Sequence, residues 1–385
     1  MSNENMNPEN STPRHTRRPP AYKVRQAQTR KKVLRVLARV GISVLTVLVA
    51  LVLCLSMILN QIFNGPSIAA RNILTMSLLE PSGTKWIPPL FLDKATLNEI
   101  QNGSTGSELP DEFDPNKVQI NTDTSLNANS DEWKNHPDGV RIERLSGATF
   151  NAHVMIIRDP SKVYMATSSE TFSKDKPGLR ITEAIEKEGA IAAINAGAFY
   201  DNGTSNPVVG SVPEGLVIAG GKVVWNKVEM GVPENGFAGF NKDNVLVVAS
   251  SMTASKAMEL NIRDGCCFGP VLIMNGQVNE KVYNGNSGFN PRTAIGQRAD
   301  GAVIFLCIDG RTVSSPGGTY RDIIDIMTEY GAVNACNLDG GSSSVMLYRD
   351  QQGLFGEAGK VQMINNYSLL QSEPRKMPNY FMVKP

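Results

Sequence analysis

Two aspartates follow apolar segments and precede glycines, a placement that suits catalysis. Residues 302–308 lead into an Asp-Gly-Arg turn at Asp309, and residues 332–338 lead into an Asp-Gly-Gly turn at Asp339. Glycines beside a carboxylate let the backbone approach a ligand closely, and successive backbone N–H groups in such a loop form a concave anion site. The plainer alternative for each aspartate is a cap on a tight turn, because Asp-Gly is a common turn sequence.

The segment between the two aspartates predicts a crossover connection. Apolar side chains recur there at helical spacing, at Ile323, Ile326, Met327 and Tyr330. A strand, a helix and a second strand in this order connect parallel strands. If both strands belong to one sheet, both aspartates lie at the same edge, which is where α/β proteins place their ligands.

A basic residue and a glycine-rich loop are candidates for binding an anion. Arg292 lies in an Asn-Pro-Arg-Thr sequence, and its guanidinium suits a bidentate grip on phosphate or carboxylate. The loop at 314–319, with Gly317 and Gly318, leads into a predicted helix N-terminus, which also suits a phosphate. The loop lacks the lysine of a P-loop, so nucleotide binding is not implied. The alternatives are a surface salt bridge for Arg292 and a simple connection for the loop.

A third strand exit carries further polar residues. The apolar run 190–194 ends in Asn195, and Asp201 follows after an intervening glycine. An Asx turn explains one of these residues readily and explains the whole segment less well.

The histidine count excludes several chemistries. The chain has three histidines, at positions 15, 136 and 153, so a histidine-rich zinc site is excluded. A Ser-His-Asp triad through the serines 342–344 would need His153, and nothing in the sequence supports that contact. Carboxylate chemistry with arginine and backbone donors remains. It suits cleavage at an anomeric carbon, where a phosphate leaving group needs little protonation.

The remaining patterns predict an α+β fold with a mixed, mostly antiparallel sheet and packed helices. Strands are expected at 140–147, 153–159 and 162–168, and a short helix at 181–188. Three hairpins are expected, turning at 220–221, near 242–244 and at 275–276.

The N-terminal part of the chain predicts a membrane anchor. Residues 1–39 hold ten Lys or Arg and two Glu, a net charge of +8, which leaves −7 for the rest because the chain totals +1. Residues 40–59 carry no charge, and at about 1.5 Å per residue they span a bilayer core of about 30 Å. The basic flank places the N-terminus in the cytoplasm and the C-terminal mass outside. A cleaved signal peptide is the alternative.

We therefore predict five parts: a disordered basic tail at 1–39, a transmembrane helix at 40–62, a juxtamembrane helical segment at 63–100, a flexible acidic linker at 101–138 and a catalytic domain at 139–385. The negative charge of the large domain argues against nucleic acid as its partner. Among five cysteines no C-x-x-C pair occurs; those in the two apolar strands are expected to be buried thiols, and their pairing is left open.

Five segments, taken in order, resemble the phosphodiester glycosidase family, which includes the uncovering enzyme that removes N-acetylglucosamine from a phosphodiester on mannose. The segments are NAGAFYD, GPVLIMNG, NPRTAIG, DGR and NLDGGSSSVM, and the resemblance covers roughly residues 140–385. It implies functional roles for the following matching positions: Asn195, Gly197, Phe199, Asp201, Arg292, Thr293, Asp309, Arg311, Asn337, Asp339, Gly340 and Gly341.

Two positions depart from the family's pattern. Ser342 stands where the family has a third glycine, and Ala198 stands where it has Phe. The serine would narrow the loop or donate to a ligand, and the alanine would open the pocket. Neither departure removes a charged group, so the implied activity is retained.

We expect a membrane-anchored extracytoplasmic glycosidase that hydrolyses a sugar-1-phosphodiester in an envelope or exopolysaccharide glycan. Arg292 and the loop with Gly317 and Gly318 would bind phosphate, Asp339 would act as nucleophile or base, and Asp309 would assist or hold Arg311. One alternative is a non-catalytic anchored module that binds anionic wall polymer. Another is a phosphodiesterase that uses Ca²⁺ or Mg²⁺ held by the Asp and Asn loops.

Overall fold

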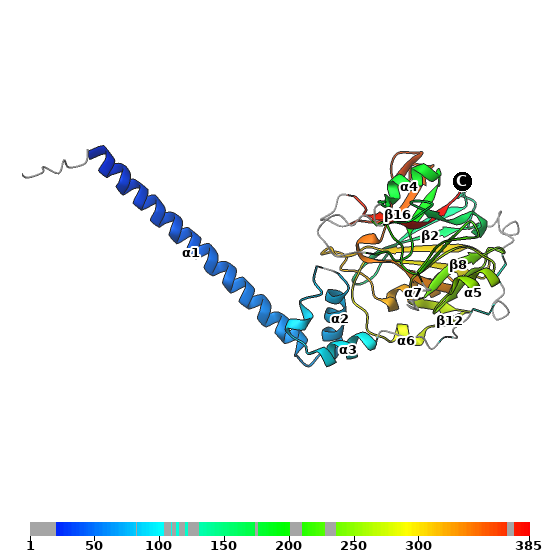
Figure 1. Cartoon of the computed structure of the whole chain (residues 1–385), viewed down its shortest axis with the longest axis horizontal. Helices are drawn as coiled ribbons and strands as arrows, with labels where there is room; N and C mark the ends of the chain where they lie inside the picture. The colour runs from blue at the N-terminus through cyan, green and yellow to red at the C-terminus, as the bar shows by residue number, and fades with distance from the viewer. Residues whose placement is uncertain are drawn as a thin grey trace, which may run out of the picture. The chain divides into compact units, whose positions relative to one another are not determined.

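The structure is a computed structural model of the 385-residue chain. It describes residues 21–81, 83–103, 109, 113–114, 120–121, 131–173, 176–200, 210–227, 236–367 and 373–385. The chain divides into two compact units, Met1–Gln61 and Ile62–Pro385, and each unit is described by itself (Figure 1).

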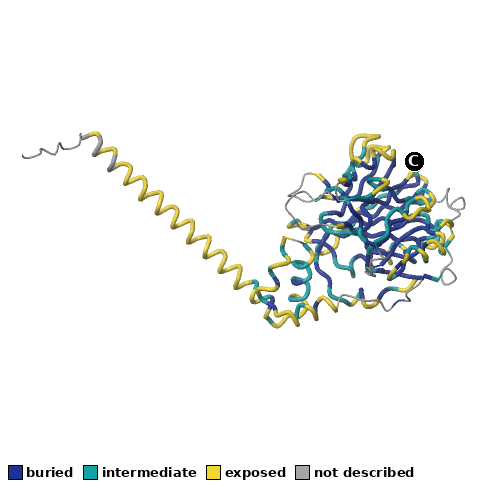
Figure 2. The backbone as a smooth tube through the Cα atoms, in the orientation of Figure 1, coloured by how far each residue is buried: buried dark blue, intermediate teal, exposed yellow. Residues whose placement is uncertain are grey.

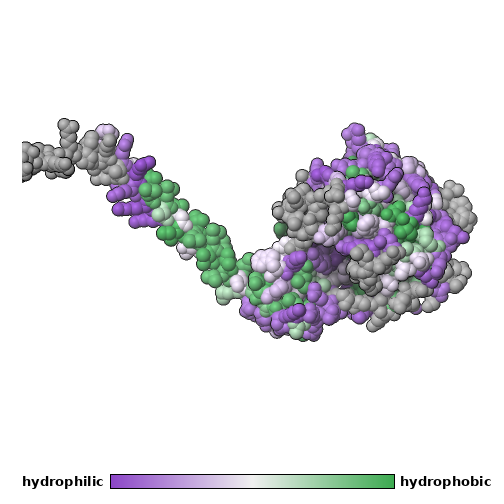
Figure 3. All heavy atoms as spheres, viewed as in Figure 1, coloured by the Kyte–Doolittle hydropathy of each residue, from purple (hydrophilic) through white to green (hydrophobic). Residues whose placement is uncertain are grey.

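Helix α1, Ala21–Phe63, makes up the described part of the first unit, and its last two residues fall in the second unit. The stretch Thr29–Phe63 is long and apolar enough to cross a membrane, and none of its most apolar window is buried. Figure 3 shows this helix hydrophobic along most of its visible face and hydrophilic near its N-terminal end. The helix starts within the tail predicted to be disordered, because the sequence after Ala21 is rich in Arg, Lys, Ala, Gln and Leu, which favour helix.

The second unit is a mixed α+β domain built from antiparallel sheets, as the sequence predicts. Its largest sheet has seven strands in the order β1-β2-β14-β13-β15-β11-β12. These strands are β1 Val140–Ser146, β2 Asn151–Ile157, β11 Val271–Met274, β12 Gln277–Val278, β13 Arg292–Arg298, β14 Val303–Ile308 and β15 Ala332–Leu338.

Two five-stranded sheets and a two-stranded sheet complete the domain. The first has the order β7-β6-β10-β8-β9, the second β17-β16-β5-β19-β3, and the small sheet pairs β18 with β4. Their bounds are β3 Val163–Thr167, β4 Leu179–Arg180, β5 Ala192–Asn195, β6 Leu216–Ala219, β7 Lys222–Asn226, β8 Phe237–Asn241, β9 Leu246–Ala249, β10 Ile262–Cys267, β16 Met346–Asp350, β17 Lys360–Met363, β18 Lys376–Met377 and β19 Asn379–Val383.

The described helices of this unit are α2 Ile68–Leu79, α3 Lys94–Asn102, α4 Ile181–Glu188, α5 Ala254–Glu259, α6 Glu280–Tyr283 and α7 Tyr320–Glu329, with short 3-10 turns at Pro88–Leu90, Pro160–Lys162 and Gly341–Ser343. Helices α4, α5 and α7 pack against the sheets, whereas α2 and α3 pack on each other and α6 packs on α7. The three predicted hairpins are present as β6–β7, β8–β9 and β11–β12.

Alternating side chains of the central strands divide the core into layers. In β14, Phe305 packs toward the two five-stranded sheets, whereas Ile304 and Leu306 face the opposite side with Ile323 and Met327 of α7. This is the period-two alternation of a strand buried on both faces. Figure 2 shows the buried backbone concentrated in the interior of this unit. None of the five cysteines forms a disulfide, and the four in this unit are buried.

The sheet order brings the two aspartate loops to one edge. Strand β13 lies between β14 and β15 and is antiparallel to both, so β14 and β15 are parallel to each other. Thr293 near the start of β13 pairs with Cys307 on one side and with Leu338 on the other. The strands that end before Asp309 and Asp339 are therefore two spacings apart, roughly 10 Å. This confirms the predicted common edge.

The segment that follows α1 is part of the second unit and packs against its later residues. Ser77 of α2 accepts a 2.8 Å hydrogen bond from the backbone N–H of Phe289, and Asn72 donates a 3.0 Å bond to Asn286. The predicted linker at 101–138 also has buried residues in its described part: Leu109, Phe113 and Trp133 belong to core clusters of the domain. A single buried Trp removes much apolar surface from water, which explains why the fold starts before residue 139.

Candidate active site

Asn195 ties together three segments at the sheet edge. Its side-chain N–H donates a 2.5 Å bond to the carbonyl of Asp339, and its Oδ1 accepts from the Thr293 hydroxyl at 2.9 Å and from the Val345 N–H at 3.1 Å. Asn195 and Thr293 are fully buried. The structure therefore brings these predicted residues to the site, but as its internal support and not as a surface for substrate.

Pro291 lies between the two glycine-flanked loops. Its carbonyl accepts a 2.8 Å bond from the Gly341 N–H. A Cβ on Gly340 would lie 2.9 Å from that carbonyl oxygen, and a Cβ on Gly310 would lie 2.6 Å from the Pro291 nitrogen. Glycine is needed at both places because the backbones approach too closely for any side chain.

Asp309 is almost completely buried at the exit of β14. Its Oδ1 accepts from the backbone N–H of Asn366 at 2.9 Å, and its Oδ2 accepts from the Asn366 side chain at 2.7 Å. Burial raises the pKa of Asp309, and the Asn366 bonds and the Arg144 charge oppose that shift only in part. A raised pKa favours the protonated carboxylic acid, which is the form that can donate a proton.

His153 lies beside this carboxyl group. Its Nδ1 is 3.8 Å from Asp309 Oδ1 and has no hydrogen-bond partner among the described residues. Burial, and secondarily the Arg144 charge, lowers the pKa of His153 to about 4, so the imidazole is neutral at pH 7. No hydrogen bond in the described part of the chain links His153 to serines 342–344, so the geometry does not assemble a triad.

Asp339 is half-buried at the exit of β15. Its N–H donates a 3.0 Å bond to the Ala196 carbonyl, and its own carbonyl accepts from Asn195. These two bonds fix the backbone from which the carboxylate projects. Gly341, the second glycine after Asp339, has φ +61, a left-handed conformation that glycine adopts without strain.

Arg311 and Arg375 flank the loop after Asp339. Arg311 has a left-handed backbone (φ +59), and its Nη2 lies 3.0 Å from where a Cβ of Gly341 would be. Arg375 donates a 3.2 Å bond to the Ser342 hydroxyl, and its guanidinium stacks 4.7 Å from the Phe199 ring centre. The serine that replaces the family's third glycine thus holds an arginine at the loop. Sequence reasoning missed Arg375, which lies in no recognisable motif.

The charges around Arg311 form one cluster. Partial desolvation lowers its pKa, Glu80 and Tyr367 act in the opposite direction, and Arg292 and Arg375 lower it further. Tyr367 donates a 2.5 Å bond to the Ser342 carbonyl. Arg311 bonds Asn290 Oδ1 at 3.4 Å and makes no ion pair with the described residues, so the expected Asp309–Arg311 contact is not formed.

Arg292 occupies a different environment. It is 4% exposed; its Nε donates to the Gly318 carbonyl, and its Nη2 donates to the Gly288 carbonyl and to Glu80 at 3.0 Å. Its guanidinium also lies 4.4 Å from the Tyr320 ring centre. These donors are already engaged, so this geometry does not support a phosphate-binding role for Arg292.

The glycine loop at 314–319 is likewise used for packing. Gly317 has φ +135, and a Cβ there would lie 2.5 Å from the backbone of Asn290. Gly318 exchanges backbone hydrogen bonds with Asn290, and the Tyr320 N–H at the start of α7 donates to Ser287. Thr319 and Asp322 form the predicted capping box. The loop is therefore the connection that we gave as the alternative to a phosphate site.

The remaining predicted residues support the backbone or fall outside the described residues. A Cβ on Gly197 would lie 3.1 Å from Cys266 Sγ, so the backbone approaches that side chain closely. The Gly197 N–H donates a hydrogen bond to the Asn379 side chain. Asn337 is buried in β15 and donates to the Gly269 carbonyl at 2.8 Å. Asp201 lies outside the described residues, so its predicted role stays a prediction.

A small cavity lies between Asp309 and the loop that follows Asp339. It is about 20 Å³ in volume and is lined by Asp309, Arg311, Ser342, Ser344 and Tyr367, among others. This volume suits about one water molecule. The Ser344 hydroxyl is buried and has no hydrogen-bond partner among the described residues.

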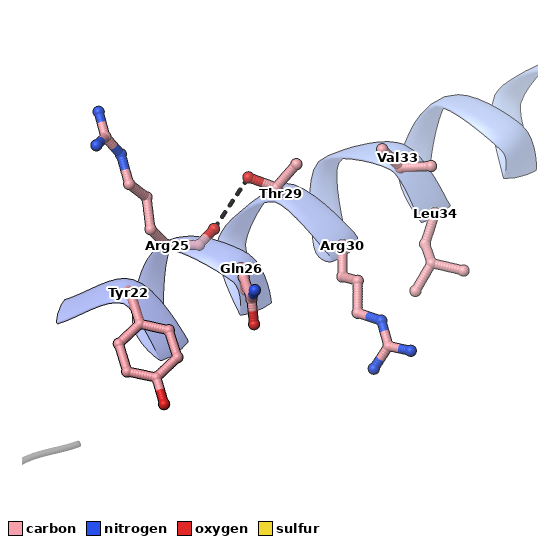
Figure 4. Close-up of a pocket in the computed structure, with 7 residues that line it drawn as sticks. All are labelled: Tyr22, Arg25, Gln26, Thr29, Arg30, Val33 and Leu34. Carbon is pink, nitrogen blue, oxygen red and sulfur yellow. Dashed lines mark hydrogen bonds between the residues drawn. The ribbon is translucent and has the colours of Figure 1, made fainter. Parts of the chain in front are cut away.

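Two other features bear on ligand binding. Within the described part of the chain, no group of three or more His, Cys, Asp or Glu residues could hold a metal ion. A hollow beside the first turns of α1 is lined by Tyr22, Arg25, Gln26, Thr29, Arg30, Val33 and Leu34, all from that single helix (Figure 4). Its dashed hydrogen bond, from Thr29 to the Arg25 carbonyl, is internal to the helix.

The family to which the chain belongs defines its class as a hydrolase of the glycosidase type. A model of the phosphodiester glycosidase family matches residues 188–384, and the chain belongs to that family. The chain is 26% identical over 191 residues to the SPbeta prophage-derived uncharacterized protein YomE of Bacillus subtilis (strain 168); the match covers 48% of this chain and only 27% of YomE.

Solved structures are also similar. The catalytic domain of zebrafish N-acetylglucosamine-1-phosphodiester alpha-N-acetylglucosaminidase, auto-inhibited by its pro-peptide, matches with a TM-score of 0.48 and 18% identity over 64% of this chain and 82% of that one. A hypothetical protein from Synechocystis matches with a TM-score of 0.40 and 16% identity over 64% of this chain and 61% of that one.

Proposed function

We propose that the second unit hydrolyses a sugar-1-phosphodiester in an envelope or exopolysaccharide glycan. The observation that carries the proposal is the convergence of Asp309, the Asp339 loop and the guanidiniums of Arg311 and Arg375 at one sheet edge. A phosphodiester carries a negative charge next to the anomeric carbon, and two arginines beside two carboxyl groups match that distribution of charge.

Arg311 and Arg375 are the groups that bind the phosphate in this proposal. Arg311 lies against the backbone of Gly341, and Arg375 donates to the Ser342 hydroxyl, so both guanidiniums lie at the loop that follows Asp339. Arg292 stays behind them as a buried, paired cation. The phosphate assignment therefore moves from Arg292 and the 314–319 loop to Arg311 and Arg375.

The two carboxyl groups divide the chemistry between them. Asp339, half-buried and adjacent to the loop, acts at the anomeric carbon as nucleophile or base. Burial raises the pKa of Asp309, which favours its protonated form. Asp309 therefore assists as an acid, or it holds the attacking water in the adjoining cavity. No metal is needed in this scheme.

Helix α1 indicates where in the cell the reaction would take place. Its apolar stretch would anchor the protein in the cell membrane, with the basic N-terminus in the cytoplasm and the second unit outside. A glycan substrate outside the cytoplasm fits that topology.

The test is product analysis with the full-length protein in detergent. Sugar-1-phosphodiesters with different sugars are incubated with the protein, and the products are measured by mass in H₂¹⁸O. Glycosidic cleavage puts ¹⁸O into a free reducing sugar and leaves an unlabelled phosphomonoester. Release of sugar-1-phosphate, or label in the phosphate, would show a phosphodiesterase instead, and polymer binding with no turnover of any substrate would favour the anchored binding module.

A further inference from the structure

The segment that follows the apolar helix contributes a charge to the site. Glu80 caps the C-terminus of α2, and its carboxylate forms a 3.0 Å ion pair with Arg292. Arg292 is 4% exposed, and the Glu80 side chain is 29% exposed. Within the described residues, Glu80 is the only carboxylate that forms an ion pair with this buried guanidinium, and a buried charge needs such a partner.

Glu80 is held in place by the rest of α2. Besides the Ser77 and Asn72 bonds, the backbone of α2 approaches residue 288 so closely that a Cβ on Gly288 would lie 2.2 Å from the Ser77 nitrogen. The helix thus packs directly on residues 286–289, which lead into Pro291 and Arg292.

The same short segment determines the position of both aspartate loops. Pro291 contacts Gly310 and bonds Gly341, and Asn290 bonds Gly318 and accepts from Arg311. A displacement of residues 290–292 would therefore reach the loops of Asp309 and Asp339 together. Misplacing a reacting group by about 1 Å can cost roughly 100-fold in rate.

We propose that Glu80 is a positioning residue of the active site. It acts through Arg292, so the catalytic unit begins at α2 and not near residue 139, where the sequence predicts the start of the catalytic domain. The inference rests on the proposed glycosidase function, because turnover is what it would alter. The opposite possibility is that Glu80 occupies the arginine cluster as a competitor of the substrate anion, in which case its removal would raise activity.

The experiment compares variants of the full-length protein in detergent. Glu80→Gln keeps the shape and removes the charge, and we expect kcat to fall roughly 10- to 100-fold with KM little changed. Glu80→Asp keeps the charge and should restore part of the loss. Glu99→Gln is the matched control, since Glu99 is an exposed carboxylate on the neighbouring helix α3 and should leave kcat unchanged.

A double-variant cycle tests whether Glu80 acts through Arg292. In an Arg292→Gln background, adding Glu80→Gln should cause no further loss of kcat; independent, additive losses would overturn the proposal. Unchanged kcat in Glu80→Gln, or a lower KM with higher activity, would also overturn it. A wild-type protein inactive on every phosphodiester would instead refute the proposed function. Should E80Q fail to fold, Ser77→Ala, which removes the acceptor for the Phe289 N–H and no charge, takes its place with the same expected loss of kcat.

Discussion

The side chain of Asn195 donates a 2.5 Å hydrogen bond to the main-chain carbonyl of Asp339, a residue 144 positions further along the chain. This bond joins the end of β5 to the end of β15, which belong to different sheets. The loop that carries the candidate nucleophile is therefore fixed from the adjoining sheet as well as from its own.

Asn195→Ala should destabilise the domain by about 3 kcal/mol, because it leaves the Thr293 hydroxyl, the Val345 N–H and the Asp339 carbonyl without their buried partner. Urea unfolding of the full-length protein measures the loss. Asn284→Ala, which removes an exposed amide, is the control and should change little. An equal loss in both variants would contradict the structural role of Asn195.

Asp339→Asn should abolish turnover while the fold is preserved, because the change keeps the shape of the side chain and the backbone bonds and removes the carboxylate. Initial rates, together with circular dichroism and the melting temperature, check the two parts. Residual turnover close to that of the wild type would assign the nucleophile or base to another group.

Gly341→Ala should lower kcat/KM far more than Gly359→Ala. Both glycines have positive φ, +61 and +79, so both variants incur a similar backbone strain of about 1 kcal/mol. Only at Gly341 does the added methyl meet a side chain, Arg311 Nη2 at 3.0 Å, whereas Gly359 has nothing within 4 Å. Similar losses of kcat/KM in the two variants would show that activity does not depend on the position of Arg311 beside Gly341.

Arg311→Gln should raise KM by roughly 10- to 100-fold, which is the effect expected for losing one charge-assisted hydrogen bond to phosphate. Inhibition by inorganic phosphate should weaken in parallel. Arg321→Gln serves as the control, because Arg321 is exposed and lies over the Tyr283 ring away from the aspartate loops. An unchanged phosphate inhibition constant in Arg311→Gln would remove Arg311 from the anion site.

His153 should make stability depend on pH. Its folded pKa of about 4 lies below the ordinary 6.5, so its contribution is fully present above pH 6.5 and is lost as pH falls toward 4, by about 3 kcal/mol. Asp309, whose pKa is raised, acts in the opposite direction at low pH. The difference in unfolding free energy between the wild type and His153→Gln, measured from pH 7 to pH 4.5, isolates the histidine. A difference that grows at low pH would mean that protonated His153 pairs with Asp309.

Much of the fold could be predicted because its signals are local. Period-two apolar patterns mark the strands, and Asn275-Gly276 marks a hairpin whose two residues both have positive φ. The shared edge of Asp309 and Asp339 followed from a strand–helix–strand order alone. The capping box at Thr319 and Asp322 is also a local signal.

The partners of the site residues could not be predicted in this way. Asn366 holds Asp309 from 57 positions away, and Glu80 pairs with Arg292 across 212 positions. Each contact depends on tertiary packing and leaves no pattern in its own neighbourhood. The motif around Arg292 predicts a phosphate contact because it lies next to the site. In the fold this guanidinium is buried and paired with Glu80, so it supports the site from inside. Such contacts could be found from sequence only through covariation of the two positions among related proteins.

The four buried thiols of the second unit have a practical consequence. Because Cys266, Cys267, Cys307 and Cys336 are buried thiols with no disulfide among them, packing and hydrogen bonds hold this part of the domain together. Alkylating reagents should therefore label these positions only after the domain unfolds.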